Sequence, residues 1–130
     1  MNAVEHDLAD VCQEWRRLAE AEGEAITARN WSLLAACQKA LELLQTRTTP
    51  ILAATRAEWA GSADRADREQ KLNALLQELI QLEHRNRTLL DGMLATAHKK
   101  MDDLNRAGRH LKQIRRSYAF APAAAWNSFS

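Results

Sequence analysis

The sequence predicts an all-α protein, either an antiparallel helical hairpin or a three-to-four-helix bundle, with one long coiled-coil-like C-terminal helix. Three observations predict this class. Apolar residues recur at three- and four-residue steps. The 130 residues hold only four glycines and two prolines, and they lack the β-branched runs of a sandwich or barrel. We expect helices at about 4–24, 31–60 and 63–118 in one bundle, residues 1–118, and a tail at 119–130.

The first helix is predicted by an apolar stripe that alternates steps of four and three, as in a coiled-coil seam. Glycine is unfavourable inside a helix, so Gly23 is a site where a turn or a kink is expected. Residues 24–29 are also compatible with a helix that continues beyond the glycine. The stripe consists of Val4, Leu8, Val11, Trp15 and Leu18.

The second helix begins after Asn30, whose side chain can accept a hydrogen bond from a backbone N–H of the first turn. Pro50 has no backbone N–H to donate and clashes with the preceding turn. Because the apolar spacing resumes at Ile51, we expect a kink or a short break there and no long loop. The apolar face consists of Trp31, Leu34, Cys37, Leu41 and Leu44. The tryptophans expected in the core are Trp15, Trp31 and Trp59.

The third helix would be far longer than a typical globular helix, roughly 80 Å at about 1.5 Å per residue. Ser62 or Asp64 can cap its start. Its stripe needs a cover, which other helices of the chain, a second copy or a client can supply. Asn86 lies in the stripe, either buried, where it would fix the register, or exposed and locally satisfied. Steps of seven give Leu72, Leu79, Asn86, Met93, Lys100, Ala107 and Ile114, and also Leu76, Glu83, Leu90, Ala97, Leu104, Leu111 and Tyr118.

The last twelve residues differ in character from the helices. Residues 119–130 carry no charged side chain and include three aromatic residues, Phe120, Trp126 and Phe129. We expect a tail that is either flexible or packed back onto an apolar groove, with these aromatic side chains as its contacts.

The charged residues are distributed unevenly, although the formal net charge is only +1. Residues 1–25 hold seven acidic and two basic residues, and residues 84–118 hold nine basic and three acidic residues. This asymmetry favours an acidic first helix that lies against the basic last helix, or a basic end that docks on an acidic partner. Nucleic acid is disfavoured, because the basic residues are interleaved with acids and lack aromatic stacking partners.

The sequence holds no nucleotide-binding, hydrolase or zinc-protease motif, so we expect no enzyme, no cofactor and no metal. The residue three before each histidine is not a carboxylate, which argues against a di-iron centre of the ferritin kind. The N-terminus lacks a secretory pattern, and no apolar run approaches the roughly 20 residues that span a bilayer. We therefore expect a cytoplasmic protein without membrane insertion, in which Cys12 and Cys37 are buried, reduced thiols.

Several short motifs together resemble the bacterial flagellar export chaperones of the FliT and FlgN type. These are Asn-Trp-Ser-Leu-Leu at 30–34, Ala-Leu-Glu-Leu-Leu at 40–44, the leucine-rich stretch 75–90 and the closing Tyr118. The resemblance covers most of residues 26–120. It implies a type III secretion chaperone that binds the helical C-terminal part of a late flagellar substrate, of the cap or hook-filament junction type. Such a chaperone delivers this client to the export apparatus for bacterial flagellum assembly.

The resemblance also implies roles for particular residues. Tyr118 corresponds to a tyrosine that FlgN-type members use at the export gate, and residues 119–130 to a segment that can cover the client groove. For the groove itself we expect apolar anchors at three- and four-residue spacing. The alternative function is a generic coiled-coil adaptor or scaffold, in which the long stripe forms a homodimer. The expected client-binding residues are Leu89, Leu90, Met93, Leu104, Leu111 and Ile114.

Overall fold

Three helices make up nearly all of the part of the chain that the computed structural model describes, residues 3–119. They are α1 (Ala3–Ala28), α2 (Trp31–Trp59) and α3 (Arg65–Ala119), and no strand occurs among the described residues. The prediction of an all-α bundle with a long C-terminal helix is confirmed. The chain divides into two units after Leu90, so α3 contributes to both.

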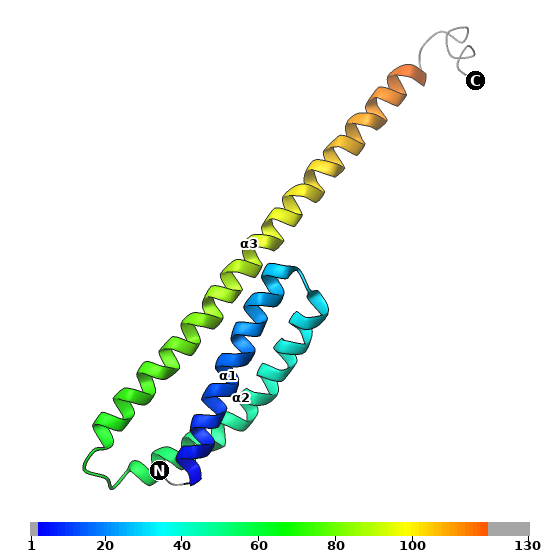
Figure 1. Ribbon diagram of the computed structural model, residues 1–130. Helices are drawn as coiled ribbons and strands as arrows, with labels where there is room; N and C mark the ends of the chain where they lie inside the picture. The colour runs from blue at the N-terminus through cyan, green and yellow to red at the C-terminus, as the bar shows by residue number, and fades with distance from the viewer. Residues whose placement is uncertain (1–2, 120–130) are drawn as a thin grey trace. The chain divides into compact units, whose positions relative to one another are not determined.

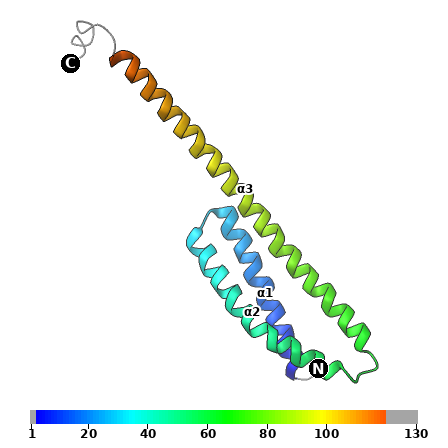
Figure 2. The ribbon, with the colours of Figure 1, turned by 180° about the vertical axis from the view of Figure 1, so that it is seen from behind.

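The first unit, described from residue 3 to 90, is a three-helix bundle. α1 and α2 form an antiparallel hairpin, and α1 lies between α2 and the first half of α3 in both views of the ribbon (Figures 1 and 2). Two apolar clusters fill the bundle, and the side chains of Trp15 and Ile51 pack against both. One cluster contains Leu8, Cys12, Trp59, Leu72 and Leu79, and the other contains Val11, Leu18, Leu41 and Leu44.

α1 continues through Gly23 to Ala28, so the continuing helix is the correct alternative at this position. The helix ends where Arg29 adopts a left-handed backbone with φ of 57°. The Arg29 N–H then donates to the Ile26 carbonyl at 3.1 Å. The Asn30 N–H donates to the Ala25 carbonyl at 2.9 Å. This pair of bonds is a Schellman motif, which satisfies carbonyl groups that the helix end leaves without partners.

The start of α2 confirms the predicted cap, because Asn30 Oδ1 accepts a hydrogen bond from the Leu33 N–H at 3.1 Å. The prediction that Trp31 lies in the core is wrong, since the side chain is 50% exposed. Trp31 has the spacing of the buried face, but it is the first residue of the helix. The spacing gives only a direction around the helix axis, whereas burial also requires a neighbour in that direction.

α2 runs through Pro50 without a break. The proline removes one helical hydrogen bond, and the threonines before it bond back along the chain. The Thr48 hydroxyl donates to the Leu44 carbonyl at 2.7 Å, and the Thr46 hydroxyl to the Glu42 carbonyl at 3.2 Å. These bonds satisfy the hydroxyl groups within the helix, which matters most for Thr48 because it is buried.

A polar cluster closes the end of the bundle where α1 begins, α2 ends and α3 begins. Glu5 Oε1 accepts a hydrogen bond from the Trp59 indole N–H at 2.9 Å and another from Arg68 at 2.7 Å. The Arg68 guanidinium also lies 6.0 Å from the centre of the Trp59 ring, which permits a cation–π contact. Asp64 precedes α3, and its carbonyl accepts the Arg68 backbone N–H at 3.0 Å.

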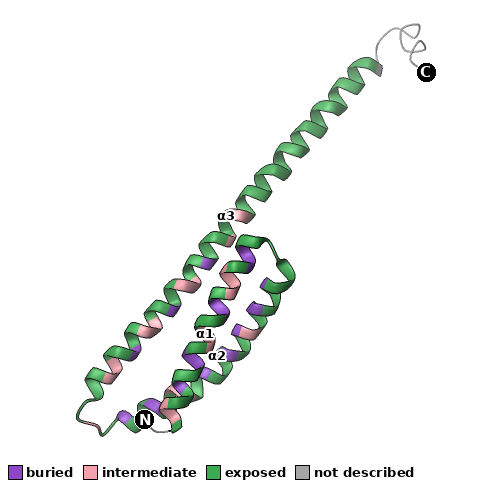
Figure 3. Cartoon of the chain, viewed as in Figure 1, coloured by how far each residue is buried: buried purple, intermediate pink, exposed green. Residues whose placement is uncertain are grey.

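The second unit consists, as far as it is described, of residues 91–119 of α3. Figure 3 shows this segment as almost entirely exposed, in contrast to the buried positions along the first unit. Only Met93 is half-buried, and every residue from Leu94 to Tyr118 is exposed. The apolar side chains of residues 94–118 are therefore exposed to solvent in the described part of the chain.

Candidate protein-binding surface

An apolar stripe runs along the described helix of the second unit. Leu104 is 71% exposed, Leu111 56%, Ile114 39% and Tyr118 62%. Steps of three and four residues separate these positions and Ala107, so the side chains share one face of the helix. We call residues 104, 107, 111, 114 and 118 the exposed stripe.

The sequence forms a helix here although the other described residues of the unit, 91–119, provide no second helix to pack against it. Residues 91–118 contain no proline and are rich in Leu, Lys, Arg and Ala, which all favour helix. Gly92 and Gly108 weaken this tendency by about 1 kcal/mol each relative to alanine. A Cβ atom at either glycine would meet nothing within 4 Å. Neither glycine is therefore needed for close packing.

The predicted client-binding residues fall into two groups. Leu104, Leu111 and Ile114 lie on the exposed stripe, and Met93 is half-buried on the same helix. The remaining two belong to the first unit, where Leu89 is 41% exposed and Leu90 is half-buried.

The residues predicted for the export apparatus and the tail lie at or beyond the end of this helix. Tyr118 is exposed on the last turn. The predicted tail contacts Phe120, Trp126 and Phe129 lie outside the residues that the structure describes.

Two exposed apolar side chains, Leu94 at 49% and Met101 at 60%, lie outside the seven-residue rows that predict the stripe. They lie seven residues apart, so they share a face beside the steps of seven that define the stripe. A third series of seven-residue steps, which starts at Leu94 and continues through Met101 to Gly108, identifies them from the sequence. The apolar face of this segment is therefore wider near Met101 than near Ile114.

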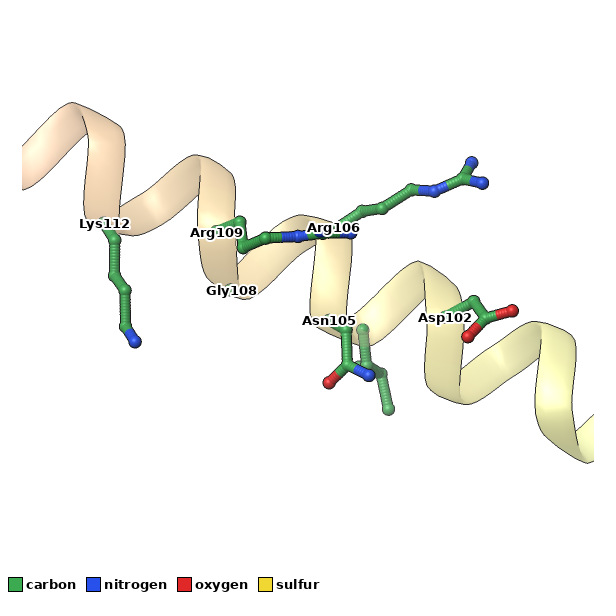
Figure 4. A pocket seen from close by; sticks show the side chains of 7 residues that line it. Asp102, Asn105, Arg106, Gly108, Arg109 and Lys112 are labelled. Carbon is green, nitrogen blue, oxygen red and sulfur yellow. The ribbon is translucent and has the colours of Figure 1, made fainter.

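A shallow depression lies beside Gly108, where the missing side chain leaves space between its neighbours (Figure 4). Arg106 and Lys112 extend from the helix in different directions in this view, and Asn105 and Arg109 lie between them. All lining residues come from one helix, so a small molecule here would keep much of its surface in water. Small-molecule sites normally enclose most of their ligand, so we assign no such site to this depression.

The first unit contains a buried polar contact between α1 and α3. Asn86 is only 2% exposed, and its Nδ2 donates to the Ala19 carbonyl at 2.7 Å and to Glu22 Oε1 at 3.1 Å. Gly23 provides the space for this side chain, because a Cβ there would lie 2.7 Å from Asn86 Oδ1. Of the two interpretations of Asn86, the structure therefore supports the buried residue, which sets the register between the two helices.

Two further polar contacts connect α1 to α3 in this unit. The Trp15 indole N–H donates to Glu83 Oε1 at 2.9 Å, and Arg16 pairs with Glu78 at 2.9 Å. The Arg16–Glu78 pair is exposed, and such pairs contribute only about 0–1 kcal/mol. The Trp15 bond places the polar edge of a large apolar ring, so it specifies orientation as well.

The two thiols are free and buried, as predicted. Burial raises the pKa of the Cys12 thiol, and burial followed by the nearby Glu22 carboxylate raises the pKa of the Cys37 thiol. A raised pKa keeps a thiol protonated at neutral pH and therefore weakly nucleophilic. Neither thiol has the environment of a catalytic nucleophile.

An apolar depression in the first unit lies beside the polar cluster of Glu5, Trp59 and Arg68. Cys12 and Leu72 contribute to its walls. Glu5 and Arg68 at its edge are already bonded to each other, and Lys71 pairs with Asp67, which leaves these charged groups poorly placed to bind a ligand. Within residues 3–119, no group of three or more metal-ligating side chains comes together.

The described helices include none with both the length and the apolar character needed to cross a bilayer. No family model, no curated protein and no solved structure matches the chain. The functional assignment therefore depends on the exposed stripe and on the sequence resemblance.

Proposed function

We propose that this protein is a cytoplasmic export chaperone of the kind its sequence resembles. It would bind the helical C-terminal part of a late flagellar substrate, of the cap or hook-filament junction type, and deliver it to the type III export apparatus. The observation that supports this proposal best is the exposed stripe on residues 104–118.

Apolar side chains that stay in water lose the free energy that burial against a partner would provide. Covering one exposed leucine or isoleucine contributes about 1.5–3 kcal/mol. The three such positions on the stripe, Leu104, Leu111 and Ile114, give a helical partner several kcal/mol before the cost of association is subtracted. An amphipathic client helix fits this surface, because its anchors recur at the same three- and four-residue spacing.

The remaining predicted residues have places in this proposal. Tyr118 lies at the end of the exposed stripe, where the export apparatus would contact it. Phe120, Trp126 and Phe129 follow directly in the sequence and would contact the stripe transiently in the absence of client, which leaves the stripe open to the client. The first unit, with its buried Asn86 contact, would provide a stable base for the binding helix.

The proposal is tested by affinity capture from a flagellated bacterium that encodes this protein, with bound proteins identified by mass. We expect recovery of a cap or hook-filament junction protein, and its loss from the variant Leu104→Asp/Leu111→Asp. The matched control is Asn105→Asp/Gln113→Asp, which adds the same two charges away from the stripe and from the positions beside it, and it should retain the client. We expect Tyr118→Ala to retain the client and to lose the export-apparatus component.

A second candidate function is a coiled-coil adaptor or scaffold, which the seven-residue spacing of Leu104, Leu111 and Tyr118 favours. The two functions predict different stoichiometry. A chaperone forms a 1:1 complex and releases its client, whereas a scaffold forms a lasting oligomer through the exposed stripe. Light scattering on the purified protein separates them, because Leu104→Asp/Leu111→Asp would convert the scaffold to a monomer and leave the mass of the chaperone unchanged.

A further inference from the structure

We propose that residues 104–118 also dock on the anionic surface of a lipid bilayer, with the helix lying in the plane of the interface. This inference goes beyond the proposed function and does not depend on it, because it requires no flagellar client. It follows from the charge, the exposure and the facial arrangement of this one segment.

The charge of the segment has a single sign. The basic side chains of residues 104–118 form no ion pair with any residue that the structure describes. All are exposed. Their charge is therefore available to an anionic surface. Residues 104–118 contain no acidic residue and five basic ones, Arg106, Arg109, Lys112, Arg115 and Arg116.

The arrangement of these residues is that of a basic amphipathic helix. Arg115 lies four residues after Leu111 and three before Tyr118, at the edge of the exposed stripe. Lys112 lies further round on the same side, and Arg106 lies beyond the other edge. Figure 4 shows Arg106 and Lys112 extending in different directions from the helix. When the exposed stripe contacts the lipid acyl chains, the long side chains of Arg106 and Lys112 can extend their charged ends to the lipid headgroups.

A bilayer fits this charge pattern better than a single acidic helix does. In a two-stranded coiled coil, the partner helix contacts the stripe itself and, outside the stripe, only the positions directly beside it. In residues 104–118 these positions are Gly108 and Arg115 on one side and His110 and Ser117 on the other. One helix would thus meet one of the five basic residues, whereas a wide anionic surface meets those on both sides of the stripe.

Two other covers would leave these charges unneutralised. A second copy of this segment brings five more basic residues and no acidic one, so the net charges of the two copies repel each other. Residues 119–130 are uncharged and so would not neutralise the basic residues. They do carry Phe120, Trp126 and Phe129, and aromatic residues are enriched at membrane interfaces.

The test measures co-sedimentation of the full-length protein with vesicles. One set contains phosphatidylglycerol and phosphatidylethanolamine, and the other contains only phosphatidylcholine. We expect binding to the anionic vesicles alone. Binding should weaken strongly in about 1 M salt, where the Debye length falls from about 10 Å to about 3 Å.

Two variants assign this binding to the segment. Arg106→Gln/Lys112→Gln/Arg115→Gln should weaken binding about 100-fold, because each basic residue near an anionic surface contributes roughly fivefold. Its control, Lys39→Gln/Arg47→Gln/Arg65→Gln, removes three exposed charges elsewhere and should bind normally. Leu111→Ser/Ile114→Ser should abolish binding.

The control for the apolar change is Leu33→Ser/Leu43→Ser, two exposed leucines of the first unit that should be dispensable. Three outcomes would overturn the proposal. They are equal binding to neutral vesicles, unchanged binding after the three charges at 106, 112 and 115 are removed, and no binding to either vesicle. Binding of a synthetic acidic amphipathic peptide in place of vesicles would assign the surface to a protein partner instead.

Discussion

Asn86 is a polar side chain in a closely packed part of the bundle, and it is satisfied by groups on another helix. Its two hydrogen bonds go to the Ala19 carbonyl and to Glu22. The Ala19 carbonyl already accepts the helical N–H of Gly23 under α-helical bonding, so Asn86 uses its second lone pair. Sliding α3 along α1 would leave the amide buried without partners, which costs about 1–3 kcal/mol. This residue therefore favours one register.

The close approach of Asn86 to Gly23 predicts that Gly23→Ala lowers the free energy of unfolding when Asn86 is present and raises it when Asn86 is replaced by alanine. Glycine to alanine inside a helix normally stabilises by about 0.5–1 kcal/mol. For Gly23→Ala we expect destabilisation by about 1–3 kcal/mol, because the new Cβ would lie 2.7 Å from Asn86 Oδ1. In the Asn86→Ala background, the same Gly23→Ala change should stabilise. Urea unfolding of the four proteins in this cycle measures both effects.

The control for this cycle is Gly61→Ala in the turn before α3, where a Cβ meets nothing within 4 Å. It should change the free energy of unfolding equally in both backgrounds. Additive effects of Gly23→Ala and Asn86→Ala would contradict the packing described for this pair.

Arg29 leads to a second prediction at the scale of one residue. It adopts a left-handed backbone with φ of 57°, which costs an L-residue about 1 kcal/mol and glycine almost nothing. We expect Arg29→Gly to raise the free energy of unfolding by about 0.5–1 kcal/mol. Arg29→Ala is the control, because it removes the charge and keeps the Cβ. If both variants gave the same gain, the cause would be charge and not backbone conformation.

The sequence predicted single residues well where the reason is local. The Asn30 cap needs only the first turn of its own helix, and its predicted role is confirmed. Trp31 was misplaced because burial depends on a neighbouring helix, and no local pattern contains that information. The Schellman motif at Arg29 was not anticipated, since glycine and not arginine is the usual residue there.

At the scale of elements, α3 shows what periodicity can and cannot predict. The same seven-residue spacing continues from Leu72 to Tyr118, and the helix was predicted almost to its observed ends. Leu72 and Leu79 are nevertheless buried, whereas Leu104 and Leu111 are exposed. A stripe indicates that a helix has an apolar face, but whether that face is buried depends on which other helices pack against it. The apolar face of residues 104–118 was thus predictable as a pattern, and its exposure was not.

This difference along α3 leads to a prediction for amide hydrogen exchange. Backbone amides of residues 72–86 are both helical and covered by the bundle, so they should exchange only on unfolding of the first unit. Amides of residues 94–118 are helical but uncovered, so local opening is enough. We expect them to exchange at least about 100-fold faster. Equal protection of the two segments would show that residues 94–118 are covered in solution by another part of the chain or by a second copy.

At the scale of the whole molecule, the two units on either side of Leu90 differ in what stabilises them: packing between helices in the first, and helix formation alone in the described part of the second. The first unit buries side chains from all three helices. The described part of the second unit is one helix, and an isolated helix is only marginally stable in water. The sequence shows no interruption at this point, because α3 is continuous as a helix and the change lies in what surrounds it.

These two kinds of stability predict thermal unfolding in two phases. Residues 91–119 are about a quarter of the described helical residues, and their helix should melt gradually at low temperature. Circular dichroism should therefore lose up to about a quarter of its helical signal before a cooperative transition. Trp15, Trp31 and Trp59 all belong to the first unit. In a Trp126→Phe variant, tryptophan fluorescence should report the cooperative transition alone.

The early phase should also be independent of protein concentration, because one helix melts without a change in association. A monomeric chaperone requires this behaviour, and it would leave the exposed stripe free for a client or for a bilayer. A scaffold held together through Leu104 and Leu111 predicts the opposite. Its second unit would be stabilised by the partner copy, and the early phase would move to higher temperature as concentration rises. Melting curves over a hundredfold range of concentration thus decide between the two functions.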